Sequence, residues 1–210
     1  MNYTHIIWDW NGTLLDDVDW CISRINTMLK KRGLSALDAG TYRRIFGFPI
    51  IDYYRRAGFD FDKEPFEKLA VEYIELYHSE ESNALLFQGA EEMLAAFQRQ
   101  GIRQVILSAS ETGNLLSQMK PFGISAYFDE ILGVSNILGG GKIEVGLEYI
   151  RRARPERAVF IGDTVHDKEV ADALGADCVL IASGHQCREI LTACGTPVVE
   201  CLEDIKKFIG

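Results

Sequence analysis

Residues 4–16 read THIIWDWNGTLLD, and the order of residue types in this stretch decides how the fold begins. The apolar run Ile6 to Trp8 ends in an acid, Asp9, so we expect a short buried strand over residues 4–9. Gly12 and Thr13 follow, with backbone N–H groups expected to be free to turn inward, as they do in anion-binding nests. The stretch therefore predicts a buried strand that delivers a carboxylate and a polar loop at its carboxyl end.

The segment from residue 16 to residue 86 has helical periodicity and no convincing strand. Apolar residues at helical spacing predict a first helix that closes near Gly33. Helices are expected at residues 16–31, 41–46, 50–57 and 64–78. A helical stretch directly after the first strand predicts an insert, residues 16–86, in a discontinuous core of residues 1–15 and 87–210.

From Gly89 onward, strand-like and helical segments alternate. Strands are expected at residues 103–107, 130–133, 157–161 and 177–181. Helices are expected at residues 90–100, 112–120, 143–152 and 165–174, and two short elements at 196–199 and 202–209. Strands separated by helices of about ten residues indicate βαβ units, so the fold class is α/β with a parallel sheet.

Composition limits the function. The 210 residues are 47% hydrophobic and carry a formal net charge of −9, which excludes intrinsic disorder and argues against nucleic-acid binding and adhesion to anionic membranes. No apolar run approaches the ~20 residues of a membrane span, and the N-terminus does not have the pattern of a signal peptide. Five cysteines without a C-x-x-C pair favour a reduced, cytoplasmic protein.

Polar side chains follow the predicted strands. Asp9 follows the first, Ser108 follows the run VIL, and Asp163 follows VFIG, with Asp167 four residues later. Lys142 follows a brief strand and a glycine-rich link. Because ligands bind beyond the carboxyl ends of strands in an open parallel sheet, we expect these residues to converge at one edge.

The gathered residues suit one kind of chemistry. Asp9, Asp163 and Asp167 would repel one another, and a divalent cation such as Mg²⁺ would relieve that repulsion. Ser108 and Lys142 supply a hydrogen-bond donor and a positive charge, which suit a phosphate group. Each residue alone also has a structural interpretation, since Asp163 could cap the helix starting near Val165 and Lys142 could be a solvated surface charge.

Four segments resemble the motifs of the haloacid dehalogenase-like hydrolase superfamily. Residues 9–16, DWNGTLLD, resemble the first motif, Asp-x-Asp-Gly-Thr followed by a leucine pair. Ser108 and Lys142 match the second and third motifs, and residues 162–167, GDTVHD, resemble the fourth, Gly-Asp-x-x-x-Asp. Residues 43–49, RRIFGFP, resemble the helical cap of the phosphoglycolate phosphatase and β-phosphoglucomutase branch.

The resemblance implies a Rossmann-like core with an inserted helical cap and a set of site residues. Asp9 would be the nucleophile of a Mg²⁺-dependent phosphatase and would form an aspartyl-phosphate, with Asn11 and Lys142 as the other catalytic positions. The metal ligands would be Asp9, the backbone carbonyl of Asn11, Asp163 and, through water, Asp167. The substrate phosphate would be bound by Asn11, Gly12, Thr13, Ser108, Ala109 and Lys142.

Position 11 departs from the family pattern. The family's phosphatases carry an acid there that protonates the leaving group and then activates water, whereas this chain has Asn11. An amide cannot exchange a proton at neutral pH, and general acid–base catalysis is worth about 10²–10⁴-fold. We therefore expect rates to depend steeply on leaving-group acidity, and Asn11→Asp to raise activity on alkyl phosphates.

Three explanations for Asn11 stay open: a working phosphatase, a slow or vestigial enzyme that binds phosphate, and an engineered substitution. In the first case the substrate would be a small phosphorylated metabolite, phosphoglycolate-like or a sugar phosphate. The alternative is a non-catalytic phosphate-metabolite-binding or regulatory protein. His166 is a conceivable proton donor, although an exposed helix position is the favoured interpretation. His185 follows Ser183 and Gly184 in a loop that could face the site, and a structural or solvent role is favoured for it.

The specificity of capped enzymes depends on cap side chains, and the candidates here are Phe48, Tyr53, Tyr54 and Arg55. Aromatic and basic residues on a helix also suit a core and a solvated face. Whether the chain is a monomer or a dimer is left open.

Overall fold

A computed structural model describes residues 3–79, 83–135 and 141–209. Within these residues six strands form one parallel sheet in the order β5-β4-β1-β6-β7-β8. The strands are β1 (His5–Trp8), β4 (Arg103–Glu111), β5 (Glu130–Val134), β6 (Ala158–Gly162), β7 (Asp177–Ile181) and β8 (Val198–Val199). The predicted α/β class and parallel sheet are confirmed.

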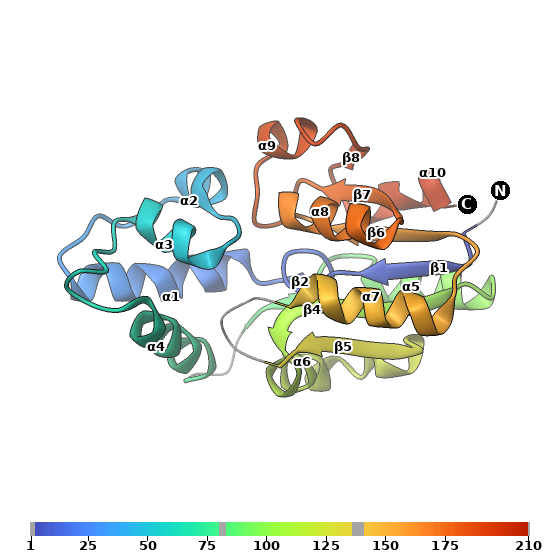
Figure 1. Cartoon of the computed structure of the whole chain (residues 1–210), viewed down its shortest axis with the longest axis horizontal. Helices are drawn as coiled ribbons and strands as arrows, with labels where there is room; N and C mark the ends of the chain where they lie inside the picture. Colours follow the sequence, from blue (N-terminus) through green and yellow to red (C-terminus); the bar gives the residue numbers. More distant parts are fainter. Residues whose placement is uncertain (1–2, 80–82, 136–140, 210) are drawn as a thin grey trace.

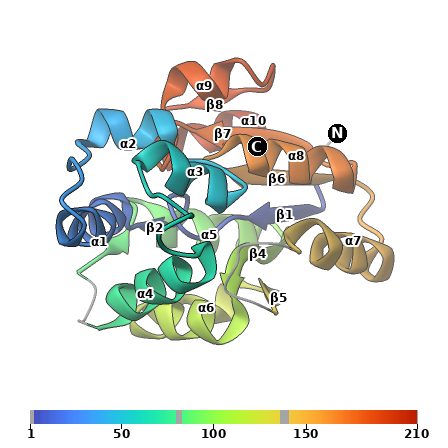
Figure 2. The ribbon, with the colours of Figure 1, turned by 60° about the vertical axis from the view of Figure 1, so that its left-hand side comes forward.

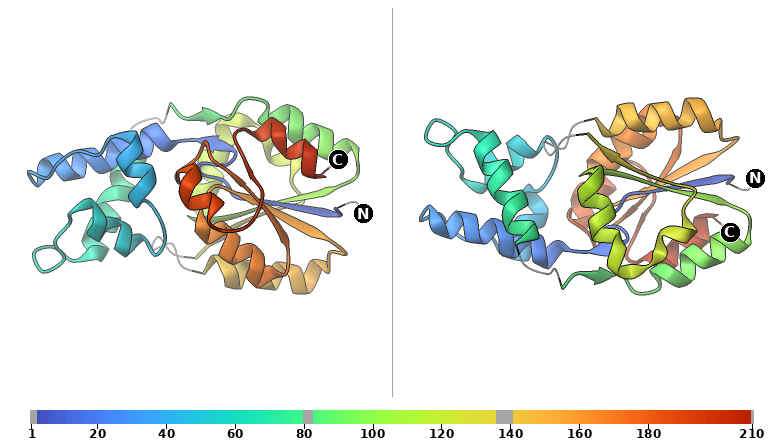
Figure 3. Two further views of the ribbon diagram at one scale, coloured as in Figure 1. Left: turned by 90° about the horizontal axis from the view of Figure 1, so that it is seen from above. Right: turned by 90° about the horizontal axis from the view of Figure 1, so that it is seen from below.

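Helices cover both faces of this sheet, as the two views in Figure 3 show. The α-helices of the core are α5 (Ala90–Arg99), α6 (Thr112–Met119), α7 (Lys142–Ala153), α8 (Val165–Leu174), α9 (Arg188–Thr192) and α10 (Lys206–Ile209). Short 3₁₀ turns are η1 (Lys120–Phe122), η2 (Ile124–Tyr127) and η3 (Leu202–Ile205). α6, α7, α8 and α9 each connect two strands of this sheet, as βαβ units do, whereas α5 follows β3 and α10 follows η3.

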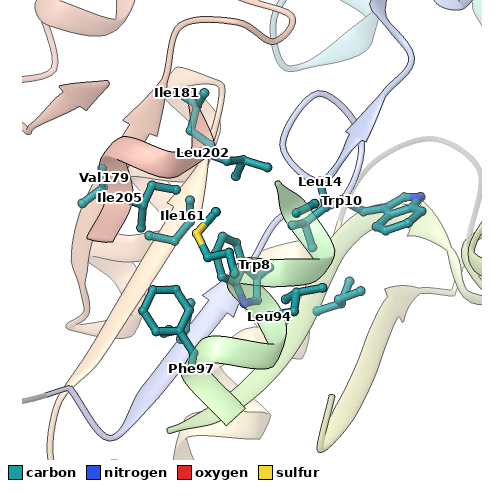
Figure 4. Packing of buried hydrophobic residues seen from close by; sticks show 14 of the residues in the cluster. Trp8, Trp10, Leu14, Leu94, Phe97, Ile161, Val179, Ile181, Leu202 and Ile205 are labelled. Atoms are coloured by element: carbon teal, nitrogen blue, oxygen red, sulfur yellow. The ribbon is translucent and has the colours of Figure 1, made fainter. Parts of the chain in front are cut away.

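The alternation of side chains along β1 explains why this strand is central. Ile6 and Trp8 point to the face covered by α5, where they pack with Leu94 and Phe97 (Figure 4). Ile7 points to the opposite face and packs in the layer under α7 and α8. The side chains of Ile6, Ile7 and Trp8 are fully buried. Burying a side chain of this size contributes about 1.5–3 kcal/mol, so two-sided burial fixes β1 in the middle of the sheet.

The helical insert forms a separate body at one end of the core (Figure 1), and Figure 2 shows that body turned forward. Its helices are α1 (Val18–Lys31), α2 (Ala39–Ile45), α3 (Ile50–Ala57) and α4 (Phe66–His78). Its own core is rich in aromatic side chains, among them Tyr42, Tyr53 and Tyr54. We call residues 16–86 the cap.

Two short strands join the cap to the core. β2 (Leu15–Asp16) and β3 (Leu85–Leu86) pair antiparallel, with Leu15 opposite Leu86. The sequence predicted no strand here, because two-residue strands lack periodicity. The predicted boundaries of the cap fall at this ladder, where entry and exit of the chain lie side by side.

The structure changes three expectations within the core. β4 runs to Glu111, four residues beyond its predicted end, and η1, η2 and α9 were not predicted. Lys142 is the first residue of α7 and does not belong to a preceding loop. The predicted glycine-rich link lies largely outside the described residues. Within the described residues, no helix has the length and apolar character needed to cross a membrane.

The close packing of α7 on the sheet makes a first prediction. A Cβ atom at Gly146 would lie 2.8 Å from Leu107 Cδ2 and 2.9 Å from Leu174 Cδ2. We expect Gly146→Ala to lower the free energy of unfolding by about 1–3 kcal/mol, because overpacking outweighs the gain in helix propensity. Urea-induced unfolding measures this change.

Gly40→Ala in α2 is the matched control, because a Cβ atom there would come no closer than 3.4 Å to Asp38 Oδ1. This variant should be neutral or slightly stabilising. Equal destabilisation by both substitutions would contradict the packing explanation.

Candidate active site

Two neighbouring strands bring Asp9 and Asp163 together. β1 and β6 are parallel with Trp8 opposite Ile161, and the Asp9 N–H donates to the Ile161 carbonyl at 2.8 Å. Each acid follows the last residues of its strand, at the edge that faces the cap. Both are buried. The expectation that acids far apart in sequence meet at one edge is confirmed for this pair.

Asp167 is held at the same edge by the start of α8. Thr164 caps α8 and accepts a hydrogen bond from the Asp167 N–H, and Asp167 Oδ2 accepts from the Thr164 N–H at 2.9 Å. The same oxygen accepts from Thr164 Oγ1 at 2.7 Å and from the Asp163 N–H at 3.1 Å. This capping box fixes the carboxylate before any ligand binds. Thr164, and not Asp163, caps the helix.

Lys142 supplies the positive charge of the site. Its Nζ donates to Asp9 Oδ1 at 2.5 Å and to Asp167 Oδ1 at 2.6 Å, and its side chain is 2% exposed. Burial alone would lower the pKa of Lys142, but Asp167 and Asp9 outweigh it, so the pKa lies above its ordinary value. Lys142 is therefore an ammonium ion at neutral pH and not a solvated surface charge.

One ammonium does not balance three buried carboxylates. Burial raises the pKa of Asp9 to about 7 although the charge of Lys142 opposes it. Burial also raises the pKa of Asp163 to about 8, with His185 opposing and Asp167 adding to the rise. Lys142 and the Thr164 hydroxyl, by contrast, outweigh burial at Asp167 and lower its pKa. Asp9 and Asp163 are therefore the two groups whose ionisation is least compensated, and without a cation they take up protons near neutral pH.

The three carboxylates fit a hard divalent cation. One oxygen from each lies within 4.8 Å of the others, and all three side chains are buried. Oxygen ligands in this number, completed by water and a phosphate oxygen, are what Mg²⁺ prefers. Both oxygens of Asp167 already accept hydrogen bonds, which suits the predicted contact through water.

The predicted phosphate-binding residues separate into two groups. Ser108 and Ala109 line the cavity beside Asp9 and Lys142. Gly12 and Thr13 are not among the described residues that line this cavity. Their backbone N–H groups are also not free to bind a phosphate. The Gly12 N–H donates to the Leu15 carbonyl at 2.8 Å and to Asp17 Oδ1 at 3.0 Å, and the Thr13 N–H to the Trp10 carbonyl at 3.3 Å. The expectation of free N–H groups is wrong because the turn uses them internally.

Gly12 still has a steric role that needs glycine. Its φ is +75°, and a Cβ atom would lie 2.3 Å from Asp163 Oδ2 and 2.5 Å from His185 Cδ2. The Thr13 hydroxyl donates to Asp163 Oδ1 at 3.3 Å. These two residues therefore position Asp163.

Asn11 is fixed by hydrogen bonds on both sides of its amide. Its Nδ2 donates to Asp17 Oδ2 at 2.8 Å, and its Oδ1 accepts from Ser110 Oγ at 3.0 Å. A carboxylate can only accept, so the amide nitrogen must face Asp17. An acid at position 11 would place two carboxylates in direct contact.

Asp17 is the centre of a buried network that the sequence did not reveal. Besides Asn11 and Gly12, it accepts hydrogen bonds from Tyr77 Oη at 2.9 Å and His185 Nε2 at 3.2 Å. Burial alone would raise the pKa of Asp17, but the charge of His185 and hydrogen bonds from His185 and Asn11 lower it. Asp17 begins α1 without capping it, since its side chain turns to the site.

His185 is the cationic partner of Asp17. Burial alone would lower its pKa, but Asp17 raises the pKa to about 9, so the ring carries both N–H groups at neutral pH. Nε2–H donates to Asp17, and Nδ1–H donates to Tyr42 Oη at 2.9 Å. The His185 backbone N–H donates to Asp163 Oδ2 at 2.5 Å. The structural role favoured for His185 from sequence agrees with these contacts.

The His166 ring makes no hydrogen bond to Asp9, Asp163 or Asp167 among the described residues. Its ring stacks on Phe48 at a centroid distance of 4.5 Å, and its Nδ1 lies 3.3 Å from Glu169 Oε2. It is not among the described residues that line the cavity. The proton-donor role considered for His166 has no support in this geometry.

Residues 6–181 match the family described as haloacid dehalogenase-like hydrolases, and this match covers most of the chain. The chain belongs to this family.

Two curated relatives span most of the chain. Tyrosine-protein kinase PtkA of Mycobacterium tuberculosis is 26% identical over 98% of this chain and 72% of the kinase. A phosphoglycolate phosphatase of Pseudomonas fluorescens is 26% identical over 86% of this chain and 70% of the phosphatase.

Among solved structures, a haloacid dehalogenase-like hydrolase from Streptococcus pneumoniae superposes with a TM-score of 0.82 at 25% identity and covers 98% of each chain. The structure of PtkA gives a TM-score of 0.83 at 24% identity, covering 100% of this chain and 99% of that one. The predicted Rossmann-like core with an inserted cap is therefore confirmed as a family fold.

The charge imbalance predicts how Mg²⁺ and pH act together. The pKa values of Asp9 and Asp163 are raised above those of the unfolded chain, so without metal these two groups reduce stability as pH rises from about 4 through 8. Mg²⁺ binds the deprotonated form, so added MgCl₂ should raise the melting temperature more at pH 8 than at pH 6. Thermal unfolding with EDTA or MgCl₂ measures both shifts.

Asp163→Asn should abolish most of the Mg²⁺-dependent shift, whereas KCl of equal ionic strength should give little shift in the native chain. A shift that is the same at both pH values, or unchanged in Asp163→Asn, would contradict this site.

The contact between Asn11 and Asp17 predicts coupling between positions 11 and 17. Asn11→Asp alone should lower the free energy of unfolding at pH 7.5 by about 1–3 kcal/mol, because it replaces a donor by a second buried acceptor. The double variant Asn11→Asp, Asp17→Asn restores a donor–acceptor pair and should lose less than the sum of the single variants. Denaturant unfolding of all four proteins completes the cycle.

Additive losses would refute the coupling. The predicted gain of Asn11→Asp on alkyl phosphates is consequently expected in the double variant and not in the single one.

Proposed function

We propose that the chain is a Mg²⁺-dependent phosphatase that hydrolyses a small phosphorylated metabolite through an aspartyl-phosphate on Asp9. The observation that carries this proposal is the buried group of Asp9, Asp163, Asp167 and Lys142 at the carboxyl edge of the sheet. The similarity to relatives named as phosphoglycolate phosphatases supports it.

Asp9, Asp163 and the backbone carbonyl of Asn11 would hold Mg²⁺ directly, with Asp167 acting through water. When bound, the ion lowers the repulsion between an anionic nucleophile and an anionic phosphate ester. Asp9 is already oriented by Lys142, so little reorganisation is needed when the ester enters.

In the first step an Asp9 carboxylate oxygen attacks phosphorus and the bond from phosphorus to the ester oxygen breaks. The leaving group departs with the electron pair, and the phosphoryl group is bonded to Asp9. Ser108 and Lys142 would stabilise the charge that spreads over the phosphoryl oxygens. In the second step water attacks the same phosphorus and the bond from phosphorus to the Asp9 oxygen breaks. The water protons remain on the released phosphate, and the Asp9 carboxylate is restored.

Asn11 limits the proton transfers in both steps. Its amide holds Asp17 and Ser110 and exchanges no proton at neutral pH. This observation favours one alternative, a non-catalytic protein that binds a phosphorylated metabolite. That alternative requires binding with no turnover of any phosphate ester, whereas the phosphatase requires turnover where the leaving group departs unprotonated.

Hydrolysis of p-nitrophenyl phosphate tests the proposal because its leaving group is acidic. Activity should require MgCl₂, be lost in EDTA, and fall at least about 10³-fold in Asp9→Asn. Asp172→Asn on α8 is the matched control, since Asp172 is exposed and pairs with Lys168, and it should retain full activity. Intact-mass analysis should detect one added phosphoryl group on the native chain and none on Asp9→Asn.

Activity that survives EDTA or Asp9→Asn would contradict the mechanism. Ligand-induced thermal stabilisation without turnover would favour the binding protein.

A further inference from the structure

The acids of the core and the aromatic side chains of the cap line one continuous cavity of about 180 Å³. Asp9, Asn11 and Lys142 lie in the part contributed by the core. The cap contributes a wall of rings and aliphatic side chains, among them Phe46, Tyr53, Tyr54, Phe66, Tyr73 and Ile74. A cavity of ~150 Å³ with an apolar lining can hold one benzene ring, so the volume suits a phosphoryl group joined to a small ring.

The rings of the wall pack against one another. Tyr53 contacts Phe46 at a centroid distance of 5.2 Å and Tyr54 at 5.6 Å, and Tyr54 contacts Phe66 at 5.6 Å. Tyr53 and Tyr54 meet edge to face, which is one of the arrangements that aromatic rings prefer. A further aromatic ring could pack on the wall in the same way. This wall is therefore preformed for an aromatic or apolar group.

Charged and polyhydroxylated groups find few partners on the wall. Among the described lining residues the cap contributes no Lys or Arg, and Lys142 and His185 are each paired with acids. A carboxylate would be desolvated there without a cation to pair it, and sugar hydroxyls would find only the tyrosine hydroxyls of the wall as partners. The buried hydroxyl of Tyr53 has no hydrogen-bond partner within the described residues, and a polar ring substituent could pair it.

The chemistry at position 11 selects the same class of leaving group independently. Of the other titratable groups that line the cavity, Glu111 accepts a hydrogen bond from the Asn114 N–H, and both ring N–H groups of His185 donate within the Asp17 network. Burial lowers the pKa of His78, the remaining histidine of the lining, so its ring is neutral at pH 7.5 and has no ring proton to give to a leaving group at that pH. A leaving group must then depart as an anion. A phenol has a pKa of about 10, against ~15.7 for water, so a phenolate leaves far more readily than an alkoxide.

We propose that the substrate is the phosphate monoester of a small phenol, with its ring among the cap aromatics and its phosphoryl group beside Asp9, Ser108 and Lys142. This assignment rests on the phosphatase function proposed above and replaces the phosphoglycolate-like or sugar-phosphate class expected from sequence.

Three substrates separate ring binding from leaving-group acidity. Phenyl phosphate has a ring and an acidic leaving group, benzyl phosphate has a ring and an alkyl leaving group, and phosphoglycolate has neither. We expect kcat/KM for phenyl phosphate to exceed that for phosphoglycolate at least about 10²-fold, and benzyl phosphate to keep a similar KM with kcat about 10²-fold lower. Faster turnover of phosphoglycolate or glucose 6-phosphate than of phenyl phosphate would overturn the proposal.

Two substitutions on α4 test the wall directly. Ile74 lines the cavity, whereas Val71 on the same helix is 45% exposed and does not. Ile74→Lys should raise KM for phenyl phosphate about tenfold and lower KM for phosphoglycolate, because it exchanges apolar contact for a cation. Val71→Lys, the matched control, should change neither. An equal effect of Ile74→Lys on both substrates would contradict the assignment of the wall.

Binding to the Mg²⁺-loaded Asp9→Asn variant separates this proposal from the proposed function. Calorimetry should show phenyl phosphate bound at least about tenfold more tightly than phosphoglycolate. If the native chain shows no turnover that depends on Asp9, the proposed phosphatase function is wrong. Tighter binding of phenyl phosphate would still support an aromatic binding site in the cap. Turnover with the reverse preference leaves the phosphatase function in place and overturns the phenolic substrate.

Discussion

The contact of the Lys142 ammonium with Asp9 and Asp167 is the interaction on which the site depends. Carboxylates buried together are expensive, because water no longer screens their charges. Lys142 carries one positive charge for the two carboxylates of Asp9 and Asp167, and His185 compensates Asp163 only in part. These acids are gathered at the carboxyl edge of the sheet, where they are buried. A divalent cation fits this place because its positive charge relieves the imbalance.

A second buried ion pair, Asp17 with His185, joins the cap to the core. Asp17 directly precedes the cap helix α1, and His185 lies in the loop after β7. Asn11 contacts both Asp17 and Ser110. The amide at position 11 satisfies the carboxylate of Asp17 and at the same time excludes proton transfer at that position. The hydrogen bond to Asp17 and the absence of a titratable group at position 11 are therefore two consequences of the same amide. Replacement of Asn11 by an acid requires a compensating change at position 17.

The cap and the core contribute different kinds of side chain to one cavity. The core supplies the charged side chains and hydrogen-bonding groups of the lining, whereas the cap supplies its aromatic wall. Phe48, Tyr53 and Tyr54, the aromatic candidates from sequence, line this wall. Arg55 is absent from the described lining and lies near Asp52 on the exposed side of α3. In the substrate that we propose, the aromatic wall and the amide at position 11 favour the same leaving group for different reasons, the first by desolvation and the second by leaving-group basicity.

The sequence by itself determined the order of β1, β4, β5, β6 and β7 and of the helices between them, because the spacing of apolar residues depends on whether one or two faces of an element are buried. It did not show β2, β3 or α9. It also predicted that Asp9, Ser108, Lys142, Asp163 and Asp167 share one edge, since parallel strands all end there. Only the tertiary structure decided that Asp17, Ser110, Tyr77 and His185 meet around Asn11, and that the N–H groups of Gly12 and Thr13 are used within their turn. The spacing of apolar residues indicates which face of an element is buried. It does not indicate a hydrogen bond between residues as far apart in sequence as Asp17 and His185. The partner of a polar side chain is therefore fixed by how the cap docks on the core, a property that no single segment of the chain contains.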